Sequence, residues 1–202
     1  MKKILLLAVL ALALPMAVFA SSDIDYTNSG GTLSGSNSGL TLSGSVLIAV
    51  NGLNGGGLIT GNNLGSVSFS TGALTSGSLQ MGGTFAAGGW FTITGNGTNG
   101  VPNGTLFSGT FTSPVSWTLV TLSNGTHNYT LTGALSGTTN TGFSTVGVTV
   151  QLTINTGRGY FNGSTTISSG DTNVVVPEPG SLSLLGTGLI GLAGLIRRKL
   201  KS

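Results

Sequence analysis

Few residues of this 202-residue chain have side chains suited to acid–base or metal chemistry, and they lie far apart in the sequence. There are four acidic residues, one histidine and no cysteine. Asp23 and Asp25 would meet Asp171 if the first and last strands pair, which would create a carboxylate pair or a set of oxygen ligands for calcium. Three acids without a loop rich in Asp and Asn support such a site only weakly. We therefore predict solvated carboxylates, with no catalytic, cofactor-binding or metal site.

The remaining charged or titratable candidates stand alone. His127 follows the Asn124-Gly125 turn, and a catalytic base would also need a carboxylate to orient it, so we predict a solvated loop histidine. Arg158 is the only cation between residues 21 and 179. We expect it to be a solvated turn residue, with an anion or sugar contact as the functional alternative.

Aromatic side chains offer a different chemistry, because their flat faces stack on sugar rings. Trp117 alternates with apolar neighbours and is expected in the core. Trp90 follows the Gly88-Gly89 bend; we favour the core for it and keep a ligand platform as the alternative. The candidate ligand contacts are Trp90, Tyr129, Arg158 and Tyr160.

The elements that must position these residues are predicted to be strands. Apolar and polar residues alternate along most of the body, most regularly at Val146, Val148, Val150, Leu152 and Ile154. Asn-Gly pairs mark turns between the strands, with Asn124-Gly125 as a hairpin. We predict a bulge at Gly44 and a hairpin bent through residues 86–89. No helical periodicity is convincing between residues 21 and 176.

About nine to eleven short strands joined by such turns indicate an all-β, antiparallel domain. We favour a β-sandwich, with a closed β-barrel as the alternative and a β-solenoid-like fold third. Short sequence echoes do not recur at a fixed period, which argues against the solenoid.

The N-terminal end has the layout of a secretory signal peptide. Lys2 and Lys3 precede an apolar run that is interrupted by Pro15, and small residues precede Ser21. We predict a signal helix over residues 1–20, export by the Sec machinery and cleavage by signal peptidase.

The C-terminal end combines three physically different parts, over residues 177–202. Pro177, Glu178 and Pro179 form an extended segment that another protein can read. The uncharged run Leu182–Ile196 covers about 22 Å as a helix, against a bilayer core of about 30 Å, so it is a marginal transmembrane helix. The basic cluster Arg197-Arg198-Lys199 keeps the C-terminus cytoplasmic.

This tripartite tail resembles the PEP-CTERM sorting signal of Gram-negative bacteria. The matching residues are Pro177-Glu178-Pro179, the Leu182–Ile196 run and Arg197-Arg198-Lys199. The resemblance implies that a membrane-embedded, exosortase-type protease cuts near Pro-Glu-Pro and passes the protein outward, often in species that make exopolysaccharide. It covers the tail alone and implies transient anchoring in the inner membrane, followed by delivery to the cell surface or the medium.

The charge of the body excludes nucleic acid as a partner. The chain has a net charge of +3, but six of its seven basic residues lie in the two end segments. Residues 21–179 contain one basic residue, Arg158, and four acidic residues, so the net charge of the body is −3. A surface of this charge does not suit the phosphates of nucleic acid. We expect residues 21–176 to form one domain with a surface of hydroxyls and amides. The expected function is that of a non-enzymatic structural or adhesive matrix protein associated with exopolysaccharide or biofilm, with a carbohydrate-binding module as the alternative.

Overall fold

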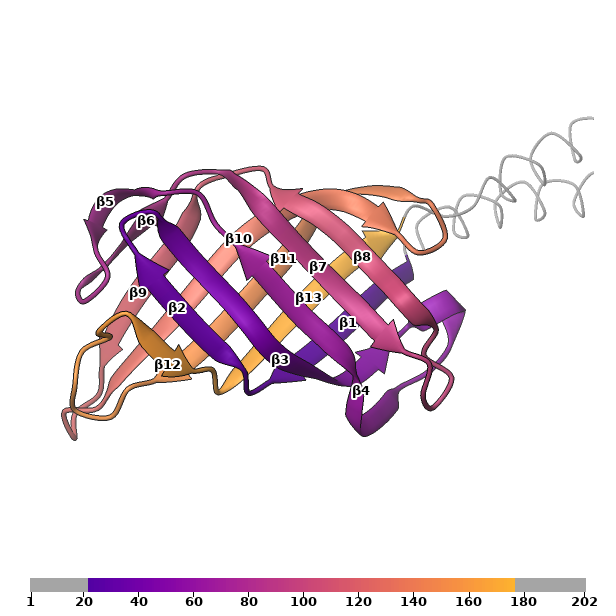
Figure 1. The fold of residues 1–202 in the computed structure, drawn as a ribbon, viewed down its shortest axis with the longest axis horizontal. Helices are drawn as coiled ribbons and strands as arrows, with labels where there is room; N and C mark the ends of the chain where they lie inside the picture. Colours follow the sequence, from indigo (N-terminus) through magenta and orange to yellow (C-terminus); the bar gives the residue numbers. More distant parts are fainter. Residues whose placement is uncertain (1–21, 177–202) are drawn as a thin grey trace, which may run out of the picture. The chain divides into compact units, whose positions relative to one another are not determined.

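The computed structural model describes residues 22–176, which form thirteen strands and one short 3-10 helix (Figure 1). The strands are β1 (Ser22–Ser29), β2 (Thr32–Ser36), β3 (Gly39–Asn51), β4 (Ile59–Ser70), β5 (Leu74–Ser78), β6 (Gly82–Phe85), β7 (Gly88–Asn96), β8 (Asn103–Phe111), β9 (Val115–Thr121), β10 (His127–Thr139), β11 (Ser144–Asn155), β12 (Ser164–Thr166) and β13 (Ser169–Val176). The 3-10 helix, η2, is Leu53–Gly55. No helix within residues 22–176 is long and apolar enough to cross a membrane. The predicted signal helix and transmembrane helix lie outside the described residues.

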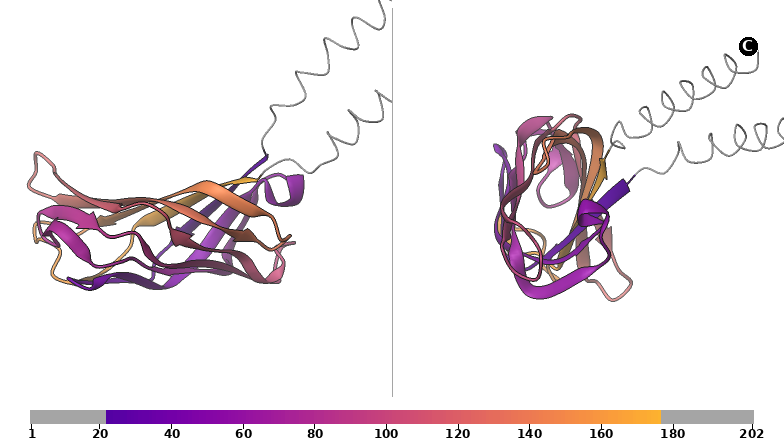
Figure 2. Two further views of the ribbon diagram at one scale, coloured as in Figure 1. Left: turned by 90° about the horizontal axis from the view of Figure 1, so that it is seen from above. Right: turned by 90° about the vertical axis from the view of Figure 1, so that its right-hand side faces the viewer.

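Eight of the strands close into a ring. Their order is β11-β13-β1-β3-β4-β7-β8-β10, and β10 pairs with β11 to complete it. The end-on view in Figure 2 shows the strands surrounding a common axis. The antiparallel all-β prediction is confirmed, whereas the favoured two-sheet sandwich is wrong. The closed barrel that was kept as the alternative is the fold, because pairing between β1 and β13 joins the two ends of the domain.

The other five strands extend the barrel wall at one end. Strand β10 pairs with β9 over His127–Thr132 and with β8 over Leu135–Thr139, so β8 and β9 follow one another along its edge. Likewise, β7 pairs with β4 and β8, while β6 pairs with β5 and β9. The predicted hairpin through residues 86–89 is therefore wrong. That segment connects β6 to β7, and the two strands do not pair with each other.

The inside of the barrel is filled by apolar side chains, because alternate residues of each strand point inward. Phe69 and Phe91 stack with ring centroids 5.9 Å apart, and Phe111 meets both rings edge-on. Towards the other end, Phe161 meets the indole of Trp117 edge-on at 5.5 Å. The core is therefore a continuous packed interior, whereas the outward positions are mainly Ser, Thr, Asn and Gly.

Two of the bulges in the sheet, at Gly44 and Gly147, bear on the sequence-based expectations about which side chains enter this core. The predicted bulge at Gly44 is confirmed: its φ is 66°, and the pairing of β3 with β4 shifts between Leu42 and Ser45. A second bulge at Gly147 was not predicted; its φ is 77°. It breaks the strict alternation in β11, so Val146 is 80% exposed while Thr145 is buried. The expectation that Val146 points inward is therefore wrong. The extra residue at the bulge makes the side chains that precede it in β11 point to the opposite side of the sheet.

Candidate functional site

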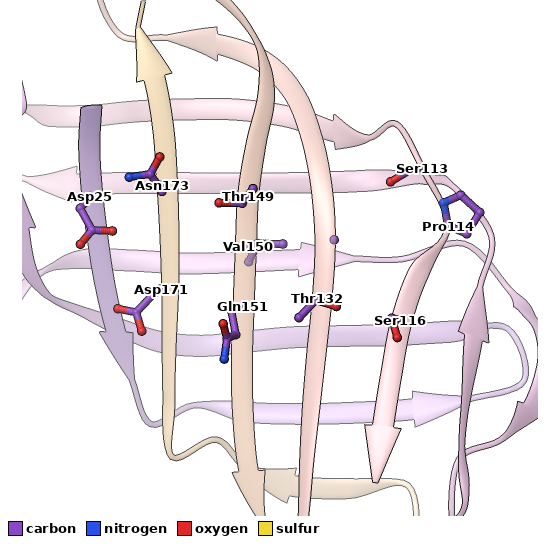
Figure 3. A pocket seen from close by; sticks show the side chains of 11 residues that line it. Asp25, Ser113, Pro114, Ser116, Thr132, Thr149, Val150, Gln151, Asp171 and Asn173 are labelled. Carbon is purple, nitrogen blue, oxygen red and sulfur yellow. The ribbon is translucent and has the colours of Figure 1, made fainter. Parts of the chain in front are cut away.

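The candidate site is a depression of about 500 Å³ on the outer face of the barrel (Figure 3). It lies over β1, β13, β11, β10 and β9, and the turn before β9 forms one end of it. The side chains that line it are mostly carboxylates, amides and hydroxyls: Asp25, Asp171, Gln151, Asn173, Thr149, Thr132, Ser113 and Ser116.

The strand register aligns four of these side chains in one row. Asp171 pairs with Gln151, Gln151 with Thr132, and Thr132 with Ser116. Figure 3 shows the four residues side by side on adjacent strands. Because neighbouring strands lie about 4.8 Å apart, the row spans about 14 Å at right angles to the strands. Its members can donate and accept hydrogen bonds along a straight line.

Two of the three predicted acids meet in this depression. Asp25 is half-buried on β1, and Asp171 is exposed on β13, the next strand in the ring. Burial raises the pKa of Asp25 above its usual value of 3.8, and the negative charge of Asp171 raises this pKa further. The sequence prediction that the chain ends could bring these acids together thus holds for this pair. Asp23 is exposed and does not line the depression.

Residues 22–176 offer few suitable ligands for a metal ion. Within residues 22–176 no three His, Cys, Asp or Glu side chains lie close enough together to hold one. Calcium prefers six or more oxygen ligands, so two carboxylates on a flat sheet are a poor set. The chemistry that suits the depression better is hydrogen bonding to a polyol, since amides, hydroxyls and carboxylates all bind sugar hydroxyls.

The predicted aromatic contacts divide between surface and core. Trp90 is 46% exposed on β7, so the ligand-platform alternative suits it better than the core that we favoured. Trp117 is buried, as expected. Tyr129 is fully buried and is therefore removed from the candidate surface contacts. It points inward because it alternates with outward-facing residues along β10.

His127 is not the solvated loop residue that its position suggested. Only 7% of it is exposed, and its Nδ1 lies 3.2 Å from the carbonyl oxygen of Gly159. The imidazole stacks on the ring of Tyr160, with centroids 4.2 Å apart. Tyr160 is 49% exposed, and Arg158 is exposed in the same loop. The strand begins at His127, earlier than expected, and its first residue points inward.

The sequence alone did not single out Gln151, Asn173, Thr149, Thr132 or Ser116. Each lies next to at least one apolar residue of its strand and so reads as an ordinary outward-facing position. Their alignment depends on the register between strands whose paired residues lie 16 to 24 positions apart in the chain. The sequence indicated only that Asp25 and Asp171 could meet. That prediction depended on β1 and β13 being neighbours.

Comparison with known proteins identifies the C-terminal segment. Residues 175–199 match the family described as the PEP-CTERM protein-sorting motif. The chain carries a PEP-CTERM sorting motif. No curated protein and no solved structure matches the chain.

The PEP-CTERM match confirms the resemblance seen in the tail. It includes Pro177, Glu178, Pro179, Arg197, Arg198 and Lys199, and it begins at Val175, inside β13. The sorting motif therefore starts within the last strand of the barrel. The motif marks a secreted or surface protein that is processed by exosortase, a membrane protein, and it indicates export with transient membrane anchoring.

Proposed function

We propose that this protein is a structural or adhesive component of the extracellular matrix, associated with exopolysaccharide or biofilm, and that it has no catalytic activity of its own. The observation that carries the proposal is the contrast between the two faces of the barrel wall. The inner face is packed with apolar side chains, which supports a role as a stable body rather than as a ligand carrier. The outer face offers hydroxyls and amides with almost no charge.

An uncharged, hydrogen-bonding surface suits contact with neutral polysaccharide. Hydroxyl and amide groups exchange water for sugar hydroxyls at little desolvation cost, compared with ionised groups. Between residues 26 and 170 Arg158 is the only charged side chain besides the titratable His127. Long-range repulsion therefore does not oppose the approach of this part of the surface to a neutral polymer or to another copy.

The proposed lack of catalysis rests on the arrangement of the titratable groups. His127 contacts a backbone carbonyl and an aromatic ring rather than an orienting carboxylate. Within residues 22–176, Asp25 and Asp171 are the one pair that resembles a glycosidase dyad, but they lie on an open sheet face. Such enzymes hold two carboxylates on either side of the glycosidic bond that they break.

The test of the structural role is cohesion of biofilm or flocs. Cells that lack the chain should form a weaker matrix under shear than wild-type cells, and the intact gene should restore its strength. A chain with Pro177, Glu178 and Pro179 replaced by alanine is the matched control, because the body is made but is not sorted. Equal cohesion in all strains would contradict the proposal.

Carbohydrate binding at the depression is the second candidate, and the row Asp171–Gln151–Thr132–Ser116 favours it. A polysaccharide lying along the row could bond to four side chains at regular spacing. Isothermal titration with neutral oligosaccharides tests this directly. Gln151→Ala should weaken binding at least about tenfold, and Ser108→Ala, on the outer face of β8, should leave it unchanged. Release of reducing ends that stops in Asp25→Asn would instead show a hydrolase.

A further inference from the structure

The Asn-Gly pairs of this chain can undergo a spontaneous covalent reaction. The main-chain nitrogen of the glycine attacks the side-chain amide carbon of the asparagine, ammonia leaves and a succinimide ring forms, which water then opens. Glycine favours the attack because it has no side chain to obstruct it. The asparagines of such pairs within residues 22–176 are Asn51, Asn54, Asn96, Asn99, Asn103, Asn124 and Asn162. All seven are exposed, so exposure does not distinguish between them.

Three of these asparagines lie in paired strands. Asn51 pairs with Asp25, and Asn96 pairs with Asn103 across β7 and β8. The side-chain amide of Asn96 also donates to the carbonyl of Asn63 at 2.9 Å. The attack requires rotation of the peptide that follows the asparagine, and in a paired strand this rotation would break the hydrogen bonds of the sheet. We therefore expect these three pairs to react slowly.

Three more asparagines are restrained by hydrogen bonds in turns. The N–H of the following glycine donates to a main-chain carbonyl, at 3.0 Å after Asn54 and at 2.9 Å after Asn124. The side-chain amide of Asn99 donates to the carbonyl of Thr60 at 3.2 Å. In each of these turns, one of the two reacting groups would have to give up a hydrogen bond before the attack.

Asn162 differs from the other six. It lies in the loop between β11 and β12, at one end of the barrel (Figure 1). Within residues 22–176, neither its side chain nor the N–H of Gly163 has a hydrogen-bond partner. The chain is held on both sides of this peptide: Phe161 N–H donates to the Tyr129 hydroxyl at 3.1 Å, and the Gly163 carbonyl accepts from Gly35 N–H at 2.8 Å. The peptide between Asn162 and Gly163 can therefore rotate while both contacts stay in place.

We propose that Asn162 is the site at which this protein deamidates and isomerises after export, with Gly163 as the internal nucleophile. The Gly163 nitrogen loses its proton as it bonds to Cγ of Asn162, and Nδ2 gains a proton and leaves as ammonia. Water opens the succinimide at one carbonyl to give aspartate, or at the other to give isoaspartate. Either product adds one negative charge. The reaction does not depend on polysaccharide binding.

The isoaspartate product should alter the attachment of β12. It adds one methylene to the main chain between Phe161 and Gly163. Among the described strands β12 pairs only with β2, over three residues that begin at Ser164. Such a short pairing cannot accommodate a longer chain before it, so we expect the Gly35–Gly163 hydrogen bond to break and β12 to loosen.

Peptide mapping by mass spectrometry tests the site. Wild-type protein, purified from cells that express the full chain, is kept in mildly alkaline buffer and sampled over time. Asn162 should convert at least about tenfold faster than each of the other six asparagines, because those sites must first open locally. In urea the seven rates should converge, since the dipeptide is the same at every site. An equal or higher rate at another pair in the folded protein, or no conversion of Asn162, would overturn the proposal.

Variants separate the reaction from its effect on β12. Asn162→Gln should prevent most of the acidic shift in isoelectric focusing, because attack on glutamine needs a less favourable six-membered ring. Asn99→Gln is the matched control and should leave that shift unchanged; an equal loss in both variants would refute the assignment. Hydrogen exchange in residues 164–166 should accelerate in aged wild-type protein. It should not accelerate in fresh Asn162→Asp, which adds the charge without the methylene, and equal acceleration there would refute the proposed effect on β12.

Discussion

The ring of Tyr129 stacks on the indole of Trp117, with centroids 4.9 Å apart and planes inclined by 16°. Its hydroxyl donates to the carbonyl of Gln80 at 2.6 Å and accepts from the N–H of Phe161 at 3.1 Å. The indole N–H of Trp117 donates to the carbonyl of Leu79 at 2.9 Å. Two inward-facing aromatic residues therefore tie the β5–β6 turn and the β11–β12 loop to the end of the barrel.

The first prediction concerns this hydroxyl. Tyr129→Phe keeps the stacked ring but leaves the Gln80 carbonyl and the Phe161 N–H without their partner. We expect a loss of about 1–3 kcal/mol in the free energy of unfolding, measured by urea denaturation. Amide hydrogen exchange should accelerate in residues 78–82 and 156–163 before the rest of the barrel. Unchanged exchange in both segments would show that the hydroxyl does not hold them.

For Tyr26, which is as buried as Tyr129, we predict that removal of the hydroxyl does not destabilise the protein. Its hydroxyl lies in the core without a hydrogen-bond partner, and burial raises its pKa. Tyr26→Phe removes an unsatisfied polar group and keeps the ring, so the free energy of unfolding should stay the same or rise by up to about 1 kcal/mol. The same denaturation measurement applies. A loss as large as that of Tyr129→Phe would mean that the Tyr26 hydroxyl has a partner in solution.

The bulge at Gly147 predicts different effects for two neighbouring valines. Val146→Thr changes an exposed side chain and should alter the free energy of unfolding by less than about 0.5 kcal/mol. Val148→Thr, of the same shape, places a hydroxyl in the core and should cost about 1–3 kcal/mol. Thermal and urea unfolding check both. Similar costs at the two positions would indicate that the strand keeps a strict alternation in solution.

The acid pair predicts a dependence of stability on pH. The pKa of Asp25 is higher in the folded than in the unfolded state, so folding favours its protonated form. The free energy of unfolding should therefore fall as pH rises from below 3.8 through the folded-state pKa, and then level off. The effect should stay below about 1 kcal/mol, because solvent screens the partly exposed carboxyl.

Asp25→Asn should remove this part of the pH dependence and make the protein slightly more stable at pH 7. Asp171→Asn should reduce the dependence without abolishing it, because burial remains the larger cause. Asp23→Asn, with an exposed side chain outside the depression, serves as the control. A free energy of unfolding that rises with pH over the same window would contradict the assigned direction.

Much of the fold follows from local sequence signals. The strands around Asn124-Gly125 and the bulge at Gly44 were predictable because glycine and asparagine tolerate the turn conformations that those positions need. The choice between sandwich and barrel was not predictable in this way. It depends on whether β1 and β13 pair, and these strands lie at opposite ends of the body, where no local pattern reports on the contact.

Only the acidic residues of the candidate site could be predicted from the sequence. Asp25 and Asp171 are conspicuous in a chain with so few charges, and their meeting follows once the barrel closes. Gln151 and Ser116 are ordinary outward-facing residues until the register aligns them. Tyr129 was singled out as a possible ligand contact but is a core residue. An aromatic residue suits either role, and the direction in which its side chain points from β10 decides between them.

The last prediction concerns the sorting motif, which begins at Val175, within β13. Replacing Pro177, Glu178 and Pro179 with alanine should abolish processing, because the segment then loses the prolines and the carboxylate that we expect the exosortase to read. The body should still fold, since its strands end at Val176. Intact-mass analysis of medium and membrane fractions checks this: the wild-type protein should appear outside in a cut form and the variant should stay uncut in the membrane fraction.

Replacing Ser164 and Thr165 of β12 with alanine is a control that should leave sorting unchanged. An uncut wild-type protein, or a variant that is cut and released as efficiently as the wild type, would show that another segment directs the export of this barrel.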